Sequence, residues 1–136
     1  MELEVTAYDH VGIRVSERVR STRFYASLGF TPDPRFDNER VSEMVTRSGV
    51  RINLIFNGER IADSHNVLLD DARKLPGFTH AAFIVDSLQA VLDWAAFHEI
   101  AITEGPVDWG RRLTCFVRDP DGNVIEFNEI LLSAAP

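Results

Sequence analysis

The sequence predicts an α+β fold made of two βαβββ modules that form a cupped mixed sheet. A strand-like stretch followed by a helix-like stretch occurs twice, at residues 8–28 and 79–98. Sliding the chain by 70 residues places His10 on His80 without a gap and aligns the apolar positions of the two segments. Short β-rich runs separated by turn residues follow each helix, so an internal repeat accounts for nearly the whole chain.

The first module is expected at about residues 7–57. Residues 8–15 (YDHVGIRV) alternate between apolar and other side chains, which predicts a strand. Residues 19–28 predict a helix, with Ser16 as the cap before it and Gly29 as the residue that stops it. The remaining segments of this module are expected as a loop at 30–37, which contains two prolines, and as strands at 41–46 and 50–56.

A linker is expected at about residues 58–77, and the second module at about 78–130. No clean period runs through 61–74, so this part is expected as a loop with one helical turn. The elements expected next are a strand at 79–85, a helix at 88–98 capped by Asp86 or Ser87, a short extended segment at 100–103, a turn at Gly105-Pro106, and strands at 113–117 and 124–127. The last two strands flank Asp119-Pro-Asp-Gly122, which is typical of a β-hairpin turn.

Composition restricts the class of protein. The 136 residues are expected to form a single domain with a substantial core, and 45% hydrophobic with 26% charged residues is typical of a globular protein. A net charge of −7 argues against nucleic acid or an anionic membrane surface as the main partner, and no apolar run approaches the roughly 20 residues of a membrane span. The single Cys115 and the lack of a leader-like segment favour a cytoplasmic protein, and residues 133–136 are expected to fray.

Polar residues occupy equivalent places in the two modules. Glu126 lies inside the apolar strand 124–127, where a carboxylate is costly unless it is paired, hydrogen-bonded or bound to a metal. A shift of 73 residues places Asn53 on Glu126, while His10 and His80 open the first strand of their modules. Two imidazoles and one carboxylate suit an open zinc site or a facial triad for Fe(II). Asn53 is a candidate for a weak oxygen ligand or for a partner of metal-bound water.

Four motifs carry a resemblance to a known group of proteins. They are Asp9-His-Val-Gly-Ile-Arg-Val15, Phe24-Tyr25 with Leu28-Gly-Phe30, Thr79-His-Ala-Ala-Phe-Ile-Val85, and Asp119-Pro-Asp-Gly-Asn-Val-Ile-Glu126. Together they resemble the vicinal-oxygen-chelate superfamily, which includes glyoxalase I, bleomycin-binding proteins, fosfomycin thiol transferases and extradiol dioxygenases. The resemblance covers about residues 7–130. It implies a homodimer in which each metal takes His10 from one subunit and His80 with Glu126 from the other.

The second module is similar to that of bacterial glyoxalase I. This resemblance implies a metal-dependent, glyoxalase-like lyase or isomerase that acts on a small oxygen-rich or glutathione-conjugated substrate. It implies that His10, His80 and Glu126 bind a divalent metal ion (Zn, Ni, Fe or Mn) and that Glu126 also moves a proton. The resembling enzymes carry a carboxylate where this chain has Asn53, so Asn53 is assigned to orienting water or substrate.

The same resemblance implies residues for the organic part of the substrate. Arg14 and Asn57 follow the two ligand positions of the first module by four residues and match the type of residue that binds the γ-glutamyl end of glutathione. Arg14 is equally typical of a solvated strand position, and Asn57 of a turn. Trp109 and Arg111-Arg112 precede the last hairpin, either as a surface loop or as a pocket rim that contacts a ligand.

Three alternatives share such a fold. An extradiol-type dioxygenase and a thiol transferase would use the same His, His, Glu metal site. A non-catalytic bleomycin-type binding protein would use the same cup for a small molecule without metal, although such proteins usually lose the ligands kept here at His10, His80 and Glu126. Fold alone does not choose between them.

Overall fold

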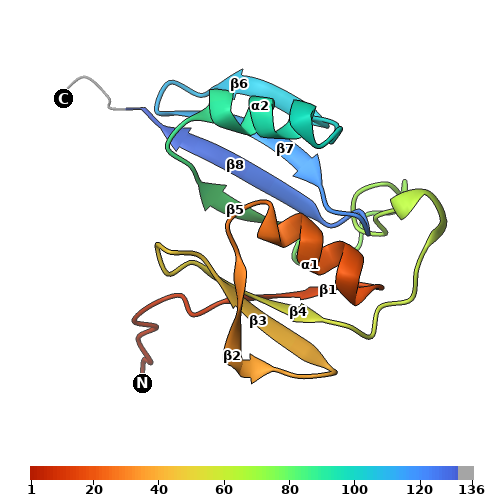
Figure 1. Cartoon of the computed structure of the whole chain (residues 1–136). Coiled ribbons are helices and arrows are strands. Elements are labelled where there is room, and N and C mark those ends of the chain that lie inside the picture. The colour runs from red at the N-terminus through yellow and green to blue at the C-terminus, as the bar shows by residue number, and fades with distance from the viewer. Residues whose placement is uncertain (132–136) are drawn as a thin grey trace. The chain divides into compact units, whose positions relative to one another are not determined.

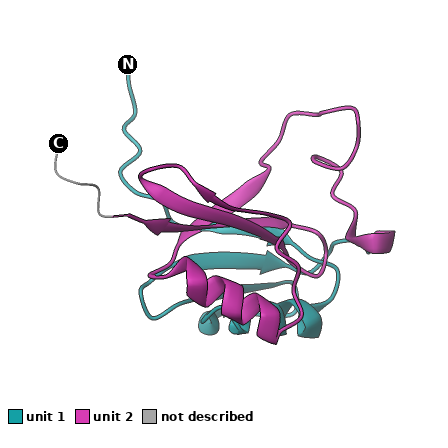
Figure 2. Ribbon diagram, turned by 90° about the horizontal axis from the view of Figure 1, so that it is seen from above, with its two compact units in different colours: residues 1–60 teal, residues 61–136 magenta. Residues whose placement is uncertain are grey.

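The computed structural model describes residues 1–131, which fall into two compact units, 1–60 and from 61 onward (Figures 1 and 2). Each unit contains a four-stranded mixed sheet and one α-helix among the described residues. The predicted α+β class and the two βαβββ repeats are therefore confirmed. The expected fraying of 133–136 concerns residues outside the described range.

The first unit holds a sheet of strand order β1-β4-β3-β2. Its elements are β1 (Val11–Arg14), α1 (Arg18–Ala26), β2 (Thr31–Asp37), β3 (Val41–Val45) and β4 (Arg51–Ile55). Strands β1 and β4 are parallel, whereas β2, β3 and β4 pair in an antiparallel manner. The cap of α1 is Glu17, not Ser16, since the Glu17 carboxylate accepts hydrogen bonds from the amides of Val19 and Arg20. Gly29 follows the helix at a φ of 94°, as its predicted stop requires.

The second unit repeats this order as β5-β8-β7-β6. Its elements are the 3₁₀ turn η1 (Ala62–Ser64), β5 (His80–Ile84), α2 (Leu88–Phe97), β6 (Glu104–Asp108), β7 (Arg112–Arg118) and β8 (Val124–Ile130). Ser87 caps α2 through its hydroxyl, which accepts from the amide of Ala90. Strands β5 and β8 are parallel, and β7 and β8 form the predicted hairpin.

Each sheet has one apolar, buried face. The buried residues of the first unit include Ile13, Val15, Phe24, Tyr25, Phe30, Met44, Ile52 and Leu54, and those of the second include Leu88, Val91, Ala95, Cys115, Val117, Ile125 and Phe127. Helix α2 lies against β7 and β8 (Figure 1). Because side chains alternate along a strand, the positions between these residues point to the other face. That second face carries the polar residues discussed below.

Two loop predictions were wrong, and both concern edge strands. Residues 30–37 were expected as a loop because of their two prolines, but 31–37 form β2, which pairs with β3 alone. The extended segment expected at 100–103 and the turn at Gly105-Pro106 are also wrong, since Glu104–Asp108 is the strand β6, paired with β7 alone. Prolines are tolerated at a sheet edge because one side of an edge strand needs no amide donor.

The segment that opens the second unit is held against the β7–β8 turn of the same unit. The Ser64 hydroxyl donates to the Pro120 carbonyl at 2.7 Å, and the Asn66 side-chain amide donates to the Gly122 carbonyl at 3.0 Å. Asp70 receives both Nη atoms of Arg118 at 2.6 and 2.7 Å. The expected loop with a helical turn is thus held against the β7–β8 turn.

Among the described residues, no helix has the length and apolar character to cross a membrane.

Candidate functional site

The two sheets place their polar residues in the same register. Asn53 of β4 lies beside Gly12 of β1, and Glu126 of β8 lies beside Ala82 of β5. These pairs correspond under the two shifts of the repeat, 70 for the first strand and 73 for the last. Each unit therefore presents an equivalent polar position on the face opposite its buried core.

In the second unit, the structure brings His80 and Glu126 together. The two side chains lie on neighbouring strands, with Nε2 of His80 3.3 Å from Oε1 of Glu126. The Glu126 side chain is only 14% exposed, so its carboxylate requires such partners. The other ring nitrogen of His80 lies 2.8 Å from the Thr79 hydroxyl, and the Phe116 ring meets the imidazole edge to face at 5.5 Å. The ring of His80 is thus held on two sides.

A hydrogen-bond chain fixes the Glu126 carboxylate from behind. Asn128 donates from Nδ2 to Oε2 of Glu126 at 2.6 Å, and the Thr114 hydroxyl donates to Oδ1 of Asn128 at 2.6 Å. Thr114 and Asn128 are both buried. Since Oε2 is held in this way, Oε1 is the oxygen directed toward His80. Sequence reasoning missed both residues, although their alternation with Glu126 along the hairpin was a usable signal.

In the first unit, His10 has two acidic neighbours. Its Nδ1 lies 2.5 Å from Oδ2 of Asp9 and 3.9 Å from Oε1 of Glu43. The three residues each offer one ligand atom within 4.8 Å of one another. Asp9 is 84% exposed, whereas the Glu43 side chain is 14% exposed. Glu43 was not among the predicted site residues.

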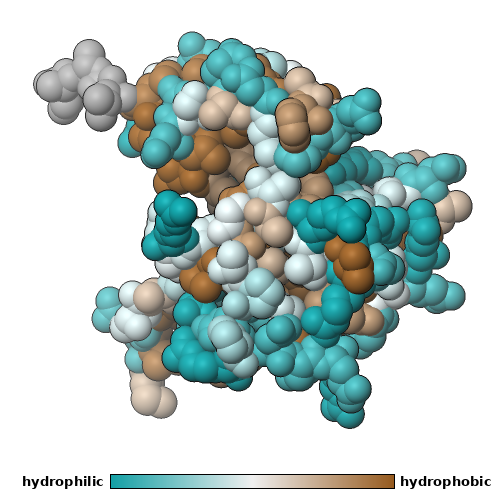
Figure 3. Space-filling view, in the orientation of Figure 1, coloured by the Kyte–Doolittle hydropathy of each residue, from teal (hydrophilic) through white to brown (hydrophobic). Residues whose placement is uncertain are grey.

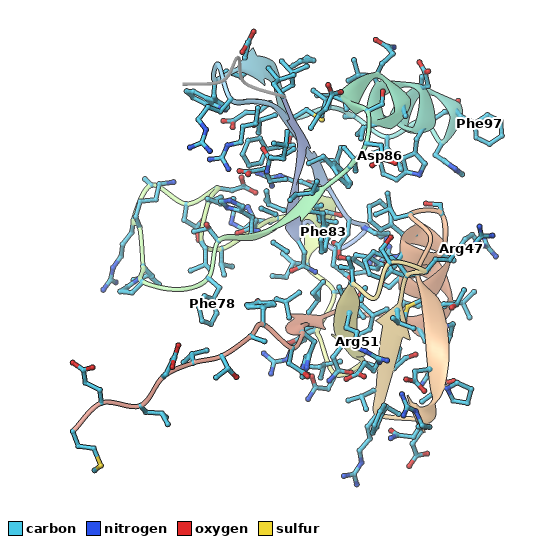
Figure 4. The ribbon with its side chains drawn as sticks, turned by 90° about the vertical axis from the view of Figure 1, so that its left-hand side faces the viewer. Arg47, Arg51, Phe78, Phe83, Asp86 and Phe97 are labelled. Atoms are coloured by element: carbon cyan, nitrogen blue, oxygen red, sulfur yellow. The ribbon has the colours of Figure 1, made fainter. Side chains whose placement is uncertain are left out.

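Glu43 lies directly opposite Asn53 in the β3–β4 ladder. Oε2 of Glu43 accepts from Nη1 of Arg51 at 2.7 Å, and the same nitrogen donates to Asp33 at 3.0 Å. Arg51 projects from β4 in Figure 4. The Arg35 side chain, its backbone amide and Arg51 hold the pKa of Asp33 well below its ordinary value, and the bond to Asp33 raises the pKa of Arg51. This network remains ionised at neutral pH and orients Glu43.

Asn53 itself has a buried acceptor. Its Oδ1 is shielded from solvent and has no hydrogen-bond partner within residues 1–131. A buried carbonyl oxygen without a donor costs about 1–3 kcal/mol, which a ligand donor would remove. Within the described part of the chain, Asn53 therefore has an unsatisfied acceptor next to the face that carries Gly12.

Arg14 and Asn57 also meet in the structure. Nε of Arg14 donates to Oδ1 of Asn57 at 2.9 Å, and both residues are exposed. Arg14 shares a face of β1 with Gly12, and His10 directly precedes that strand. The pairing orients a guanidinium, whose fork of donors matches a carboxylate.

The donor atoms of each unit have spacings that fit a share in a divalent metal site. Zinc binds imidazole nitrogen and carboxylate oxygen at about 2.0–2.2 Å, so two donors on one ion lie no more than roughly 4.2 Å apart. The 3.3 Å between His80 and Glu126 satisfies this limit, as does the 3.9 Å between His10 and Glu43. Imidazole and carboxylate donors suit zinc, nickel, iron and manganese alike.

The other polar residues considered from the sequence play no visible part in these clusters. Trp109 is 64% exposed, and Arg111 and Arg112 are exposed as well. Cys115 is fully buried, and burial raises the pKa of its thiol, so it is not an activated nucleophile.

Comparisons with known proteins place these features in a wider group. The family model described as "Glyoxalase/Bleomycin resistance protein/Dioxygenase superfamily" matches residues 7–127. The virulence protein STM3117 of Salmonella typhimurium (strain LT2) is 28% identical over 139 residues, which cover 95% of this chain and 88% of that protein. Its crystal structure superposes with a TM-score of 0.66 at 25% identity, covering 95% of this chain and all of the other (100%).

Other solved structures share the fold at lower identity. A glyoxylase/bleomycin resistance protein/dioxygenase domain from Frankia sp. EAN1pec gives a TM-score of 0.73 at 22% identity and covers 96% of both chains. An integron cassette protein from the mobile metagenome of V. Pseudocholerae gives 0.68 at 24% identity, with 95% of this chain and 98% of that chain covered. These likenesses concern the fold alone.

Proposed function

Because the chain belongs to the glyoxalase/bleomycin resistance protein/dioxygenase superfamily, we propose that it is a metal-dependent, glyoxalase-like lyase or isomerase. Its substrate is a small oxygen-rich molecule or a glutathione conjugate. The metal is a divalent ion (Zn, Ni, Fe or Mn), and its ligands are His10, His80 and Glu126. The observation that carries this proposal is the 3.3 Å approach of His80 Nε2 to Oε1 of Glu126, whose side chain is only 14% exposed.

The residues of the chain have separate roles in this proposal. The bound metal supplies Lewis-acid polarisation of substrate oxygens. Glu126, besides binding the metal, accepts and returns a proton of the substrate, and Asn128 holds its carboxylate in place. Arg14, oriented by Asn57, binds a substrate carboxylate, and Asn53 accepts a hydrogen bond from water or substrate at its buried Oδ1.

The chain is also proposed to act as a cytoplasmic homodimer. Hydrophobic side chains gather on the surface of the second unit in Figure 3. Among the exposed large hydrophobic residues of this unit, Ile84 and Ile130 are 74% and 51% exposed. Ile84→Lys should shift the protein toward monomer in sedimentation velocity. Phe97→Lys is the control, since Phe97 projects from the end of α2 and is 83% exposed (Figure 4). A monomeric wild-type protein at micromolar concentration would count against the dimer.

The experiment that tests the function begins with metal content. Protein loaded with each candidate metal and dialysed should retain about one ion per chain, and His80→Ala should lose it while keeping its circular dichroism spectrum. Turnover of a glutathione hemithioacetal by the loaded protein supports the lyase. Oxygen uptake with catechols under Fe(II) would instead identify a dioxygenase. A chain that retains no metal under any condition refutes the enzyme proposal and leaves a binding protein.

A further inference from the structure

The two sheets each carry one carboxylate on the same rung of the ladder, but on different strands. In the second sheet Glu126 stands on β8 and faces Phe116 of β7. In the first sheet Asn53 stands at the equivalent place on β4 and faces Glu43 of β3. The shift of 73 residues that maps Asn53 onto Glu126 also maps Glu43 onto Phe116. The carboxylate of the first unit therefore lies on the strand next to the one that carries the carboxylate in the second unit.

A displacement of one strand is within the reach of a glutamate. Neighbouring strands lie about 4.8 Å apart, and directly opposite Cβ atoms are about 4.5–5.5 Å apart. Oε1 of Glu43 is 3.9 Å from Nδ1 of His10, within the roughly 4.2 Å that two donors on one ion permit. Glu43 therefore lies within ligand distance of Nδ1 of His10, whereas Glu126 lies near the other ring nitrogen, Nε2, of His80.

The two carboxylates are also held in the same way. Oε2 of Glu43 accepts from Arg51 at 2.7 Å, and Oε2 of Glu126 accepts from Asn128 at 2.6 Å. Both side chains are 14% exposed. In each case one oxygen is fixed by a donor and the other is directed toward an imidazole. Arg51 is itself fixed by Asp33, so the support of Glu43 is built into the sheet.

From this correspondence we infer that Glu43 supplies the carboxylate donor of the first unit to the metal, beside His10. This inference rests on the proposed metal site and adds a fourth protein ligand to it. Asn53, freed from ligation, keeps its buried Oδ1 for water or substrate. A carboxylate accepts a proton and an amide does not, so Glu43 also restores a second basic oxygen to the site.

Asp9 is the competing carboxylate, because its Oδ2 lies 2.5 Å from the same nitrogen of His10. It is 84% exposed and precedes β1, whereas Glu43 is fixed within a central strand. Ordering an exposed side chain costs conformational entropy that a preorganised ligand does not lose. Glu43 is therefore the ligand, and Asp9 is dispensable for binding.

The test is Zn²⁺ affinity, measured by competition with a chromophoric chelator, and the absorption of bound Co²⁺. Glu43→Gln keeps the hydrogen-bonding shape and should weaken Zn²⁺ binding by about tenfold or more and alter the Co²⁺ spectrum. Glu39→Gln, in the exposed turn before β3, is the control and should bind as the wild type does. Wild-type affinity in Glu43→Gln would overturn the inference, as would a loss of binding in Asp9→Asn of the same size.

A double variant guards against a general loss of structure. In Glu43→Gln/Asn53→Glu the carboxylate returns to β4, and most of the lost Zn²⁺ affinity should be regained. No recovery in a protein with a wild-type circular dichroism spectrum contradicts the role of Glu43. The two proposals fail differently: His80→Ala that still binds Zn²⁺ refutes the proposed His80 ligand alone, whereas a wild-type protein without Zn²⁺ binding refutes both.

Discussion

Asn128 donates from Nδ2 to Oε2 of Glu126 at 2.6 Å, and this contact determines which oxygen of the glutamate stays open. The Asn128 amide is itself oriented by the buried hydroxyl of Thr114. A polar chain of this kind inside a sheet is stabilising only while every member is satisfied.

Thr114→Val removes the donor while keeping the shape of the side chain. The variant should lose about 1–3 kcal/mol of unfolding free energy, because Oδ1 of Asn128 is left buried without its donor. Its Zn²⁺ affinity should fall as well, since the Glu126 carboxylate is no longer oriented. Denaturant unfolding and chelator competition measure the two effects. Thr103→Val is the control, because the Thr103 hydroxyl donates to a backbone carbonyl at an exposed site. Equal losses in both variants would contradict a special role for the Thr114–Asn128–Glu126 hydrogen bonds.

Gly122 is required where the linker meets the β7–β8 turn. It adopts a φ of 86°, and a Cβ there would lie 2.0 Å from the Ser64 carbonyl oxygen. Gly110 has a similar φ of 87° but nothing within 4 Å of its Cβ position. Gly110→Ala should therefore show only the left-handed backbone cost, about 1–2 kcal/mol. Gly122→Ala should lose clearly more in urea unfolding, and equal losses would mean that the close approach is unimportant.

The Asp70–Arg118 pair predicts a pH-dependent contribution to stability. The Arg118 hydrogen bonds, with the Asn66 amide, hold the pKa of Asp70 well below its ordinary value of 3.8. Because the folded-state pKa is lowered, the stabilisation is complete above the ordinary pKa of the unfolded state. It is lost progressively as the pH falls from there toward the folded-state pKa. Asp70→Asn should therefore show a small decrease in melting temperature at neutral pH, and this difference should shrink toward about pH 3.

The control for this measurement is Asp86→Asn, an exposed residue before α2 that Figure 4 labels. It should melt like the wild-type protein over the whole range. A difference between Asp70→Asn and the wild type that does not change with pH would show that the effect is steric and does not depend on the charge of Asp70.

The buried thiol of Cys115 gives a probe of unfolding. The residue has no exposed surface, and burial raises the pKa of its thiol. A thiolate-specific reagent should leave the native protein unmodified and should label one thiol per chain in denaturant. The native labelling rate should track the opening of the second sheet, so Gly122→Ala should accelerate it. Rapid labelling of the native wild type would contradict the packing of β7.

Much of the fold could be predicted because local signals and the repeat agree. The turn Asp119-Pro-Asp-Gly122 fixes the hairpin, and alternation around it places Glu126 on the face opposite the core. Strand β5 begins at His80 and pairs in parallel with β8, so the contact between His80 and Glu126 follows from this pairing. The two edge strands could not be predicted from residue propensities, because proline argues against a strand unless the strand lies at a sheet edge. The sequence does not show which strands lie at an edge.

Glu43 could not be identified from the sequence for a different reason. In residues 41–45 (VSEMV) a charged side chain that alternates with buried positions is typical of any strand with one solvated face. Only the pairing register shows that Glu43 lies opposite Asn53 and near His10. Glu126 stands between Ile125 and Phe127 and so interrupts an apolar run, whereas Glu43 follows the polar Ser42 and gives no such signal.

The matching registers of the two sheets also bear on how such proteins diversify. Four positions, 43 and 53 in one unit and 116 and 126 in the other, face their partners across equivalent strand pairs. A carboxylate can be exchanged between the members of either pair by two substitutions, while the backbone and the buried face stay as they are. The repeated sheet therefore offers two strand positions for one carboxylate without a change in the backbone or in the buried face.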